Sequence, residues 1–220
     1  MRKEVITEGE HYHIYNRGVE KRNIFEDEKD ITRFIRGMIE FNAKKPIGSL
    51  FENAFLLKSG KCKSGDKIVD IVSYCINPNH FHLILFSRAP NGIQKYMHRL
   101  GAGYTRYFNE KYKRTGSLFQ GTYKAKRITT NEYLTYLSAY VNLNSKVHRL
   151  GSQATKLSRS SWDFFANSKT DHIVSGTEII TKQFRNSKDY ESFALDALRL
   201  MLEQKDTSDV SEFFIESELD

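Results

Sequence analysis

The sequence predicts an α+β protein in which helices pack on one face of an antiparallel sheet. Short segments of alternating or continuous apolar residues are typical of strands. Longer segments with apolar residues three and four positions apart are typical of helices. These segments follow one another as strand, helix, strand, strand, helix, strand, helix, an order typical of a layered α+β domain.

The first strand and the first helix are indicated by a change of period. Residues 9–15 alternate and are rich in residues that favour strands, and 16–18 (Asn-Arg-Gly) turn the chain. A helix is then expected from Asp27 or Asp30 to about Phe41, because its apolar residues recur at helical spacing.

A short helix and a loop are expected before the central strands. Residues 49–52 (Ser-Leu-Phe-Glu) have the form of a capping box, which predicts a helix to about residue 57. The stretch 58–67 is rich in Lys and Gly, so we expect a mobile basic loop in which Cys62 is exposed.

Two central strands are expected at 69–76 and 80–86, joined by the turn Asn77-Pro78-Asn79. Both segments are strongly apolar, which favours a position in the middle of the sheet. A helix is expected at about 91–112, and a fourth strand with its approach at 116–128.

The last helix of the body should begin at a cap formed by Thr130 or Asn131. We expect residues 1–150 to form one domain. Residues 151–202 are Ser-rich at first and then helical, so we expect a helical appendage there. Residues 203–220 are expected to form an acidic, disordered tail.

The charge distribution indicates a polyanionic partner. The net charge is +7, yet residues 203–220 hold seven acids and one lysine, so the preceding residues carry +13. Between 95 and 127 there are nine Lys or Arg and one acid, interleaved with aromatic residues. Such a pattern is typical of proteins that bind single-stranded nucleic acid. The alternative is that the aromatic residues belong to the core and the basic residues to a solvated face.

Cysteine usage and hydropathy favour a cytoplasmic protein. Cys62 and Cys75 form no CxxC motif and no disulfide framework. No apolar run is long enough to span a membrane, and the N-terminus has no export signal. We therefore expect no membrane partner.

His80 and His82 are two residues apart on a predicted strand, so their side chains point to the same face. Two adjacent imidazoles provide half of a metal site. The alternative is that they are polar residues on a solvated face. His11 and His13 form a second pair, which we interpret as surface or packing residues because no partner is placed near them by the local pattern.

Tyr140 and Asn144 are four residues apart in a helical segment, so we expect them on one face of it. A tyrosine able to act as nucleophile, with an amide oxygen one turn away, is a sensible partner for the histidine pair. The alternative is that Tyr140 packs in the core. Tyr133, two turns earlier, is the second candidate for a nucleophile.

Four ordered segments resemble the single-tyrosine HUH transposases, and among them the REP-associated tyrosine transposase branch. The likeness covers roughly residues 10–165, and it is carried by Tyr12–Gly18 (YHIYNRG), Asn77–Leu85 (NPNHFHLIL), Tyr104–Asn109 (YTRYFN) with Gly116–Gly121 (GSLFQG), and Tyr140–Asn144 (YVNLN). One departure is that Ser145 follows Asn144 where the family commonly has proline, so the helix is expected to continue to about His148.

The resemblance implies a ferredoxin-like, RRM-like fold and a specific chemistry. Its members cleave single-stranded DNA and transfer the strand through a 5′-phosphotyrosine, which makes Tyr140 the expected nucleophile. His80, His82 and Asn144 are then expected to bind Mg²⁺ or Mn²⁺. The expected phosphate contacts are Arg17, Arg114, Lys124 and Lys126.

The same resemblance implies further partners. The DNA is expected to form hairpins, the protein is expected in the cytoplasm and on the nucleoid when bound to DNA, and a homodimer is possible in this family. The rival interpretation is a non-catalytic module that binds single-stranded DNA or RNA on the same fold. A structural zinc protein is disfavoured, because the two cysteines are dispersed and no further histidine has ligand spacing.

Overall fold

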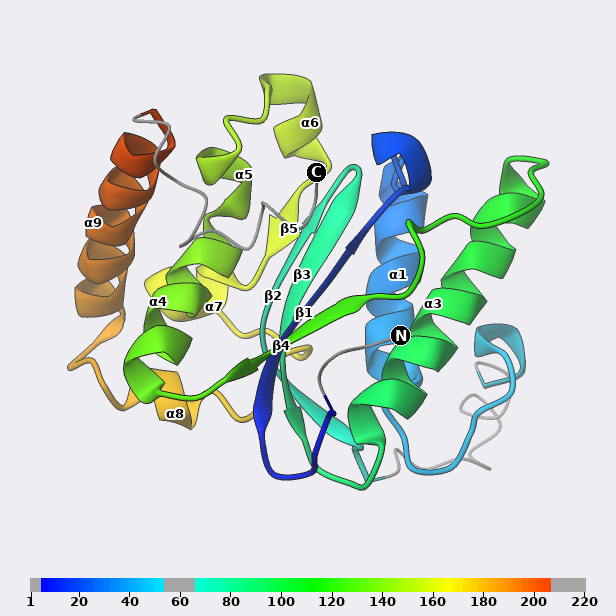
Figure 1. The fold of residues 1–220 in the computed structure, drawn as a ribbon, viewed down its shortest axis with the longest axis horizontal. Coiled ribbons are helices and arrows are strands. Elements are labelled where there is room, and N and C mark those ends of the chain that lie inside the picture. Colours follow the sequence, from blue (N-terminus) through cyan, green and yellow to red (C-terminus); the bar gives the residue numbers. More distant parts are fainter. Residues whose placement is uncertain (1–4, 54–65, 207–220) are drawn as a thin grey trace.

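A computed structural model describes residues 5–53 and 66–206. Its centre is a five-stranded sheet in which all neighbouring strands are antiparallel (Figure 1). In spatial order the strands are β4 (Lys124–Ile128), β1 (His11–Arg17), β3 (His80–Ser87), β2 (Val69–Asn77) and β5 (Arg159–Ser160). The α+β class and the antiparallel sheet predicted from the sequence are therefore confirmed.

One face of the sheet is covered by α1 (Glu28–Glu40) and α3 (Gly92–Lys111), as Figure 1 shows. Phe81 and its alternate neighbours on β3 point into the core beneath these helices. Asp27 caps α1 by accepting a hydrogen bond from the backbone N–H of Asp30, and the Asp30 side chain accepts one from the backbone N–H of Asp27, which completes a capping box.

The opposite face is covered as well, by α4 (Asn131–Asn142) and the C-terminal helices (Figure 1). These are α5 (Asn144–Val147), α6 (Ser152–Lys156), α7 (Trp162–Asn167), α8 (Glu178–Thr181) and α9 (Ser187–Asp206). We expected helices on one face, and the structure adds a second helical layer. The cause is visible in β2, whose nine residues are all buried, so both of its faces need cover.

The segment after residue 150 shares a core with the body. Its strand β5 pairs with β2, and α9 and α7 pack with α4 in the second core. Helix α9 continues to Asp206, four residues into the segment expected to be a tail. The rest of that segment lies outside the described residues.

The remaining boundaries differ from the expected ones in detail. A short 3₁₀ helix, η1 (Val19–Lys21), follows β1, and β4 begins at Lys124, later than expected. The capping box at Ser49 and Glu52 is present, with side-chain to backbone distances of 3.1 and 3.0 Å, and residues 50–53 are helical. The expected end of that helix, most of the basic loop and Cys62 lie outside the described residues.

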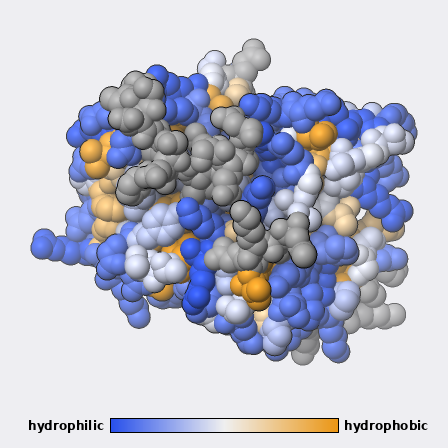
Figure 2. Space-filling view, in the orientation of Figure 1, coloured by the Kyte–Doolittle hydropathy of each residue, from blue (hydrophilic) through white to orange (hydrophobic). Residues whose placement is uncertain are grey.

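The face in Figure 2 is mostly hydrophilic, with small apolar areas between charged residues. No helix among residues 5–53 and 66–206 is long and apolar enough to cross a membrane. A polar exterior of this kind suits the excess of basic residues in the body.

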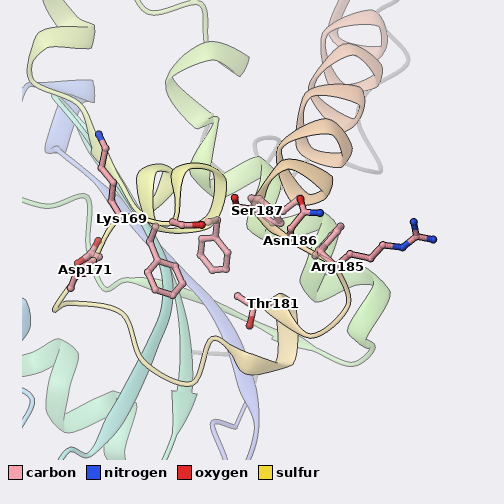
Figure 3. Close-up of a pocket in the computed structure, with 12 residues that line it drawn as sticks. Lys169, Asp171, Thr181, Arg185, Asn186 and Ser187 are labelled. Atoms are coloured by element: carbon pink, nitrogen blue, oxygen red, sulfur yellow. The ribbon is translucent and has the colours of Figure 1, made fainter.

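A cavity of about 430 Å³ lies between α7, α8 and the start of α9 (Figure 3). Its aromatic wall includes Phe164, Phe184 and Tyr190. Figure 3 shows Arg185 extending away from it. The residues that line it include neither of the histidines at 80 and 82 nor Tyr140, so this cavity is separate from the site described next.

Candidate active site

The register of the sheet gathers polar side chains on the face that α4 covers. Across β1, β3 and β2, Arg17 lies opposite His80 and His80 lies opposite Asn77. Tyr15 and Cys75 flank His82 in the same way. Because directly opposed residues in an antiparallel pair point to the same face, these side chains form one cluster at the end of the sheet.

His80 is held between two amide oxygens. Its Nδ1 lies 2.6 Å from Asn79 Oδ1, and its Nε2 lies 2.9 Å from Asn144 Oδ1. Asn77 Nδ2 lies 3.0 Å from the same Nε2 and donates to Asn144 Oδ1 at 2.6 Å. If Nδ1 carries the proton and donates to Asn79, then Nε2 presents a lone pair toward Asn144 Oδ1. Asn77 Nδ2 therefore lies within hydrogen-bond distance of both acceptors.

His82 is completely buried beside a third histidine. Its Nδ1 lies 3.0 Å from Nε2 of His13, and its Nε2 has no hydrogen-bond partner among the described residues. Burial holds the pKa of His82 well below its usual value, and the neighbouring imidazoles act in the same direction. Burial also lowers the pKa of His13 to about 3, assisted by the charge of Lys126. Both rings are therefore neutral near pH 7.

Tyr140 lies against these histidines. Its ring meets the His82 ring edge-on with centroids 5.7 Å apart, and it meets the His13 ring edge-on at 6.4 Å. The ring is 3% exposed. The two sequence segments that carried the predicted chemistry therefore meet in space, although the phenol is covered in this conformation.

The helix that carries Tyr140 ends before Asn144. Helix α4 stops at Asn142, Leu143 has φ −105° and ψ 13°, and α5 begins at Asn144. We expected the helix to run on to about His148; helical residues do continue to Val147, with His148 as the C-cap, but Leu143 interrupts them. Asn144 is the first residue of α5, and its Oδ1 lies 2.9 Å from His80 Nε2.

The C-terminal segment holds α4 in place through hydrogen bonds. Asn142 accepts a hydrogen bond from Ser161 Oγ at 2.7 Å and donates one to the hydroxyl of Tyr190 at 2.9 Å. Ser138 Oγ donates to a backbone carbonyl at 2.7 Å and lies 3.1 Å from the same hydroxyl, so it accepts from Tyr190. Ser138 and Asn142 lie on α4, and Ser161 and Tyr190 of the C-terminal segment contact them.

We expect Tyr190→Phe to lower the free energy of unfolding by about 1–3 kcal/mol, because a buried N–H of Asn142 loses its acceptor. Urea denaturation of both proteins measures this difference. Tyr136→Phe, a half-buried ring on α4, is the matched control and should change the value by less than about 0.5 kcal/mol. Equal stability of Tyr190→Phe and wild type would contradict the assigned role of this hydroxyl.

Three of the four predicted phosphate contacts lie on the face of the sheet that carries the histidine cluster. Lys124 and Lys126 are exposed on the edge strand β4, opposite Tyr15 and His13 of β1. Arg17 lies opposite His80 and donates a hydrogen bond to Gln120. Arg114 is on the other side, where it contacts Asn109 and lies over the Phe108 ring. The structure therefore does not bring Arg114 to this site.

Sequence reasoning missed three members of the cluster. His13 was interpreted as a surface or packing residue, and it contacts His82. Asn77 was assigned only to a turn. His148, whose ring centroid lies 5.3 Å from that of His80, was only a helix boundary. The signal for His13 and Asn77 was the pairing of their strands with β3, which the local pattern does not contain.

The residues present fit a divalent cation bound by mixed ligands. Among the described residues, no group of three His, Cys, Asp or Glu is arranged to hold a metal. The cluster offers two imidazoles and the amide oxygen of Asn144. Two ligands about 2.1 Å from one ion at a right angle are about 3 Å apart. His80 Nε2 and Asn144 Oδ1 are separated by 2.9 Å, and the buried His82 Nε2 lacks a partner among the described residues.

Comparison with known proteins places this fold. The family model described as "Transposase IS200 like" matches residues 7–144, more than half of the chain and the whole span from β1 to Asn144. A comparison with curated proteins finds no match. A solved structure of a REP-associated tyrosine transposase bound to a REP hairpin has a TM-score of 0.54 at 9% identity, covering 81% of this chain and 92% of that one. The chain therefore belongs to the IS200-like transposase family, with a role in DNA transposition or single-stranded DNA processing.

Proposed function

We propose that this chain cleaves and rejoins single-stranded DNA with Tyr140 as nucleophile and a divalent cation at His80, His82 and Asn144. The observation that carries the proposal is the contact of the Tyr140 ring with His82, beside the pair of His80 Nε2 and Asn144 Oδ1. Residues about sixty positions apart in the sequence meet there, and each has a side chain suited to one part of the reaction.

The residues have distinct roles. The imidazoles of His80 and His82 and the amide oxygen of Asn144 would hold Mg²⁺ or Mn²⁺, as the donor set suggests. When bound, the cation supplies positive charge to the phosphate oxygens and favours loss of the phenol proton. Asn79 orients His80 by accepting from its Nδ1 at 2.6 Å.

The reaction is an exchange of phosphate esters. Tyr140 Oη forms a bond to phosphorus while the bond to the 3′ oxygen breaks, and the phenol proton is passed on so that the 3′ oxygen leaves as a hydroxyl. The product is a 5′-phosphotyrosine. Because the number of phosphodiester bonds is unchanged, a 3′-hydroxyl of another strand can reverse the step without ATP.

The burial of Tyr140 adds a requirement. With 3% of the residue exposed, a phosphate reaches Oη only after the groups over the ring move. We propose that binding of DNA to the basic face accompanies this movement. The similar solved structure holds a REP hairpin, so a hairpin with a single-stranded extension is the substrate class we propose.

The site is proposed to work within one chain. Helix α4 follows β4 after only Thr129 and Thr130, and it packs on the sheet of the same chain. The later strand β5 returns to that sheet as well. A dimer that exchanges α4 is therefore not required to bring Tyr140 to His82.

We expect Lys124→Ala/Lys126→Ala to weaken single-stranded DNA binding. The slope of the logarithm of the binding constant against the logarithm of the salt concentration should become shallower by about 1.4, roughly 0.7 for each phosphate that is no longer neutralised. Fluorescence anisotropy with a labelled oligonucleotide at several salt concentrations measures both quantities. The matched control is Lys95→Ala/Arg106→Ala, which removes two exposed charges from α3 on the other face. An equal salt slope for both double variants would contradict a DNA path along β4.

The function is tested by incubating the protein with labelled single-stranded and duplex oligonucleotides, with Mn²⁺ or with a chelator. We expect a denaturation-resistant adduct when single-stranded DNA and Mn²⁺ are both present, and no adduct with duplex DNA or with the chelator. The rival binding module predicts a different outcome: DNA binding unaffected by the chelator and by His80→Ala, and an adduct under neither condition.

A further inference from the structure

The two histidines of β1, His11 and His13, have different surroundings. His13 is completely buried, and its Nε2 lies 3.0 Å from Nδ1 of His82. Their rings are within 15° of parallel, with centroids 5.1 Å apart. His11 lies nearer the other end of the strand, where its ring contacts Phe86 with centroids 4.8 Å apart. Only one member of the pair therefore contacts a proposed metal ligand.

The contact between His13 and His82 allows two arrangements of protons. A neutral imidazole carries one N–H, so at this 3.0 Å contact one of the two facing nitrogens donates and the other accepts. If His82 donates from Nδ1, its Nε2 is left with a lone pair. If His13 donates from Nε2, then His82 carries its proton on Nε2, and that nitrogen cannot ligate a metal.

We infer that His13 is a positioning residue for His82: it accepts a hydrogen bond from Nδ1 and so holds the ring in the tautomer and orientation in which Nε2 can bind a cation. The inference deepens the proposed function and rests on it. His82 Nε2 fits this role, because it is buried and lacks a hydrogen-bond partner among the described residues. Asn79 makes the equivalent contact to Nδ1 of His80 at 2.6 Å. Each proposed imidazole ligand thus has its own acceptor on Nδ1.

The other described neighbours of His82 contact the face and the edge of its ring or lie opposite it on the next strand. Tyr15 stacks on the His82 ring with centroids 5.8 Å apart, and Tyr140 meets it edge-on, so these two rings contact faces and edges. Cys75 lies opposite His82 on β2, and its Sγ donates to Asn77 Oδ1 at 3.7 Å. Removal of the His13 imidazole therefore leaves the Nδ1 proton of His82 buried without its acceptor.

The test measures Mn²⁺ binding by calorimetry in the absence of DNA. We expect His13→Phe, which keeps a ring of similar size, to weaken Mn²⁺ binding about 10- to 100-fold. His13→Gln should recover part of the affinity, because its amide oxygen can accept from Nδ1. The matched control is His11→Phe, which alters the other histidine of the pair and should bind as wild type does.

A second measurement reports on the proton itself. In Mg²⁺-saturated wild-type protein, ¹⁵N-detected NMR of the histidine rings should show His82 protonated at Nδ1 and His13 unprotonated at Nε2. Protonation of His13 Nε2 with a bare His82 Nδ1 would overturn the inference, even if His13→Phe failed to fold.

The outcomes separate this inference from the proposed function. Wild-type affinity in His13→Phe, together with loss of binding in His82→Ala, overturns the role of His13 and leaves the proposed site intact. Absence of Mn²⁺ and Mg²⁺ binding by the wild type overturns both.

Discussion

Tyr140→Phe is expected to abolish the covalent adduct with single-stranded DNA, a fall of at least about 10³-fold in the rate of cleavage. The variant removes one oxygen, the atom that forms the bond to phosphorus, and keeps the ring that packs against His82 and His13. Binding of the oligonucleotide should be unchanged. Denaturing gels that follow a labelled oligonucleotide in Mn²⁺ measure the adduct, and anisotropy measures the binding.

Two other tyrosines on α4 serve as controls for this result. Tyr133 and Tyr136 are half-buried in the second core. Within the described part of the chain, the ring contacts between α4 and the histidine cluster are made by Tyr140. We expect Tyr133→Phe and Tyr136→Phe to form the adduct at close to the wild-type rate. Survival of the adduct in Tyr140→Phe, with loss in Tyr133→Phe, would transfer the role to the second candidate.

His82→Ala is expected to remove both Mn²⁺ binding and the metal-dependent adduct. The imidazole is completely buried at the centre of the cluster, with Tyr140 on one side and His80 on another, at ring centroid distances of 5.7 and 5.1 Å. Calorimetry with Mn²⁺ and the adduct assay give the two readouts. DNA binding measured in a chelator should remain, because the basic residues of β4 are untouched.

The control for His82→Ala is His98→Ala, an exposed histidine on α3 at the other face of the sheet. It should bind Mn²⁺ and form the adduct as the wild type does. Because a buried ring is lost in His82→Ala, its fold should be checked by circular dichroism. Full adduct formation by a folded His82→Ala protein would contradict the assignment of this ligand.

The part of the site that lies within one strand could be predicted from the sequence. The period of two in a strand is enough to place His80 and His82 on one face, and both are found there. The spacing of Tyr140 and Asn144 also pointed to a helical segment, although the structure interrupts that helix between them. The interruption at Leu143, with φ −105° and ψ 13°, is not indicated by the helical spacing of Tyr140 and Asn144.

The basic and aromatic stretch between 95 and 127 shows the limit of composition. Lys111 forms ion pairs with Asp27 and Asp30 at 2.8 and 2.6 Å, and Arg99 donates to the carbonyl of Ala43. Tyr104 is buried in the first core. Part of this stretch therefore stabilises the packing of α1 against α3, and the alternative of core aromatic residues was correct for it.

Contacts between distant segments account for the rest. The role proposed for His13 depends on the register between β1 and β3, and the support of α4 depends on Tyr190, which lies 48 residues beyond Asn142. Neither contact leaves a local period in the sequence. The second helical layer was missed for the same reason, because the sequence of a buried strand does not indicate which helices pack on it.

The central claim is that Tyr140 becomes attached to the 5′ side of a cleaved strand at the histidine cluster. The most direct measurement is tandem mass spectrometry of the adduct formed by wild-type protein, a hairpin oligonucleotide with a single-stranded extension and Mn²⁺, after digestion with protease and nuclease. We predict a nucleotide linked through its 5′-phosphate to the peptide that contains Tyr140, and no such peptide when a chelator replaces Mn²⁺. A nucleotide attached to any other residue, or an adduct formed equally in the chelator, would contradict the account.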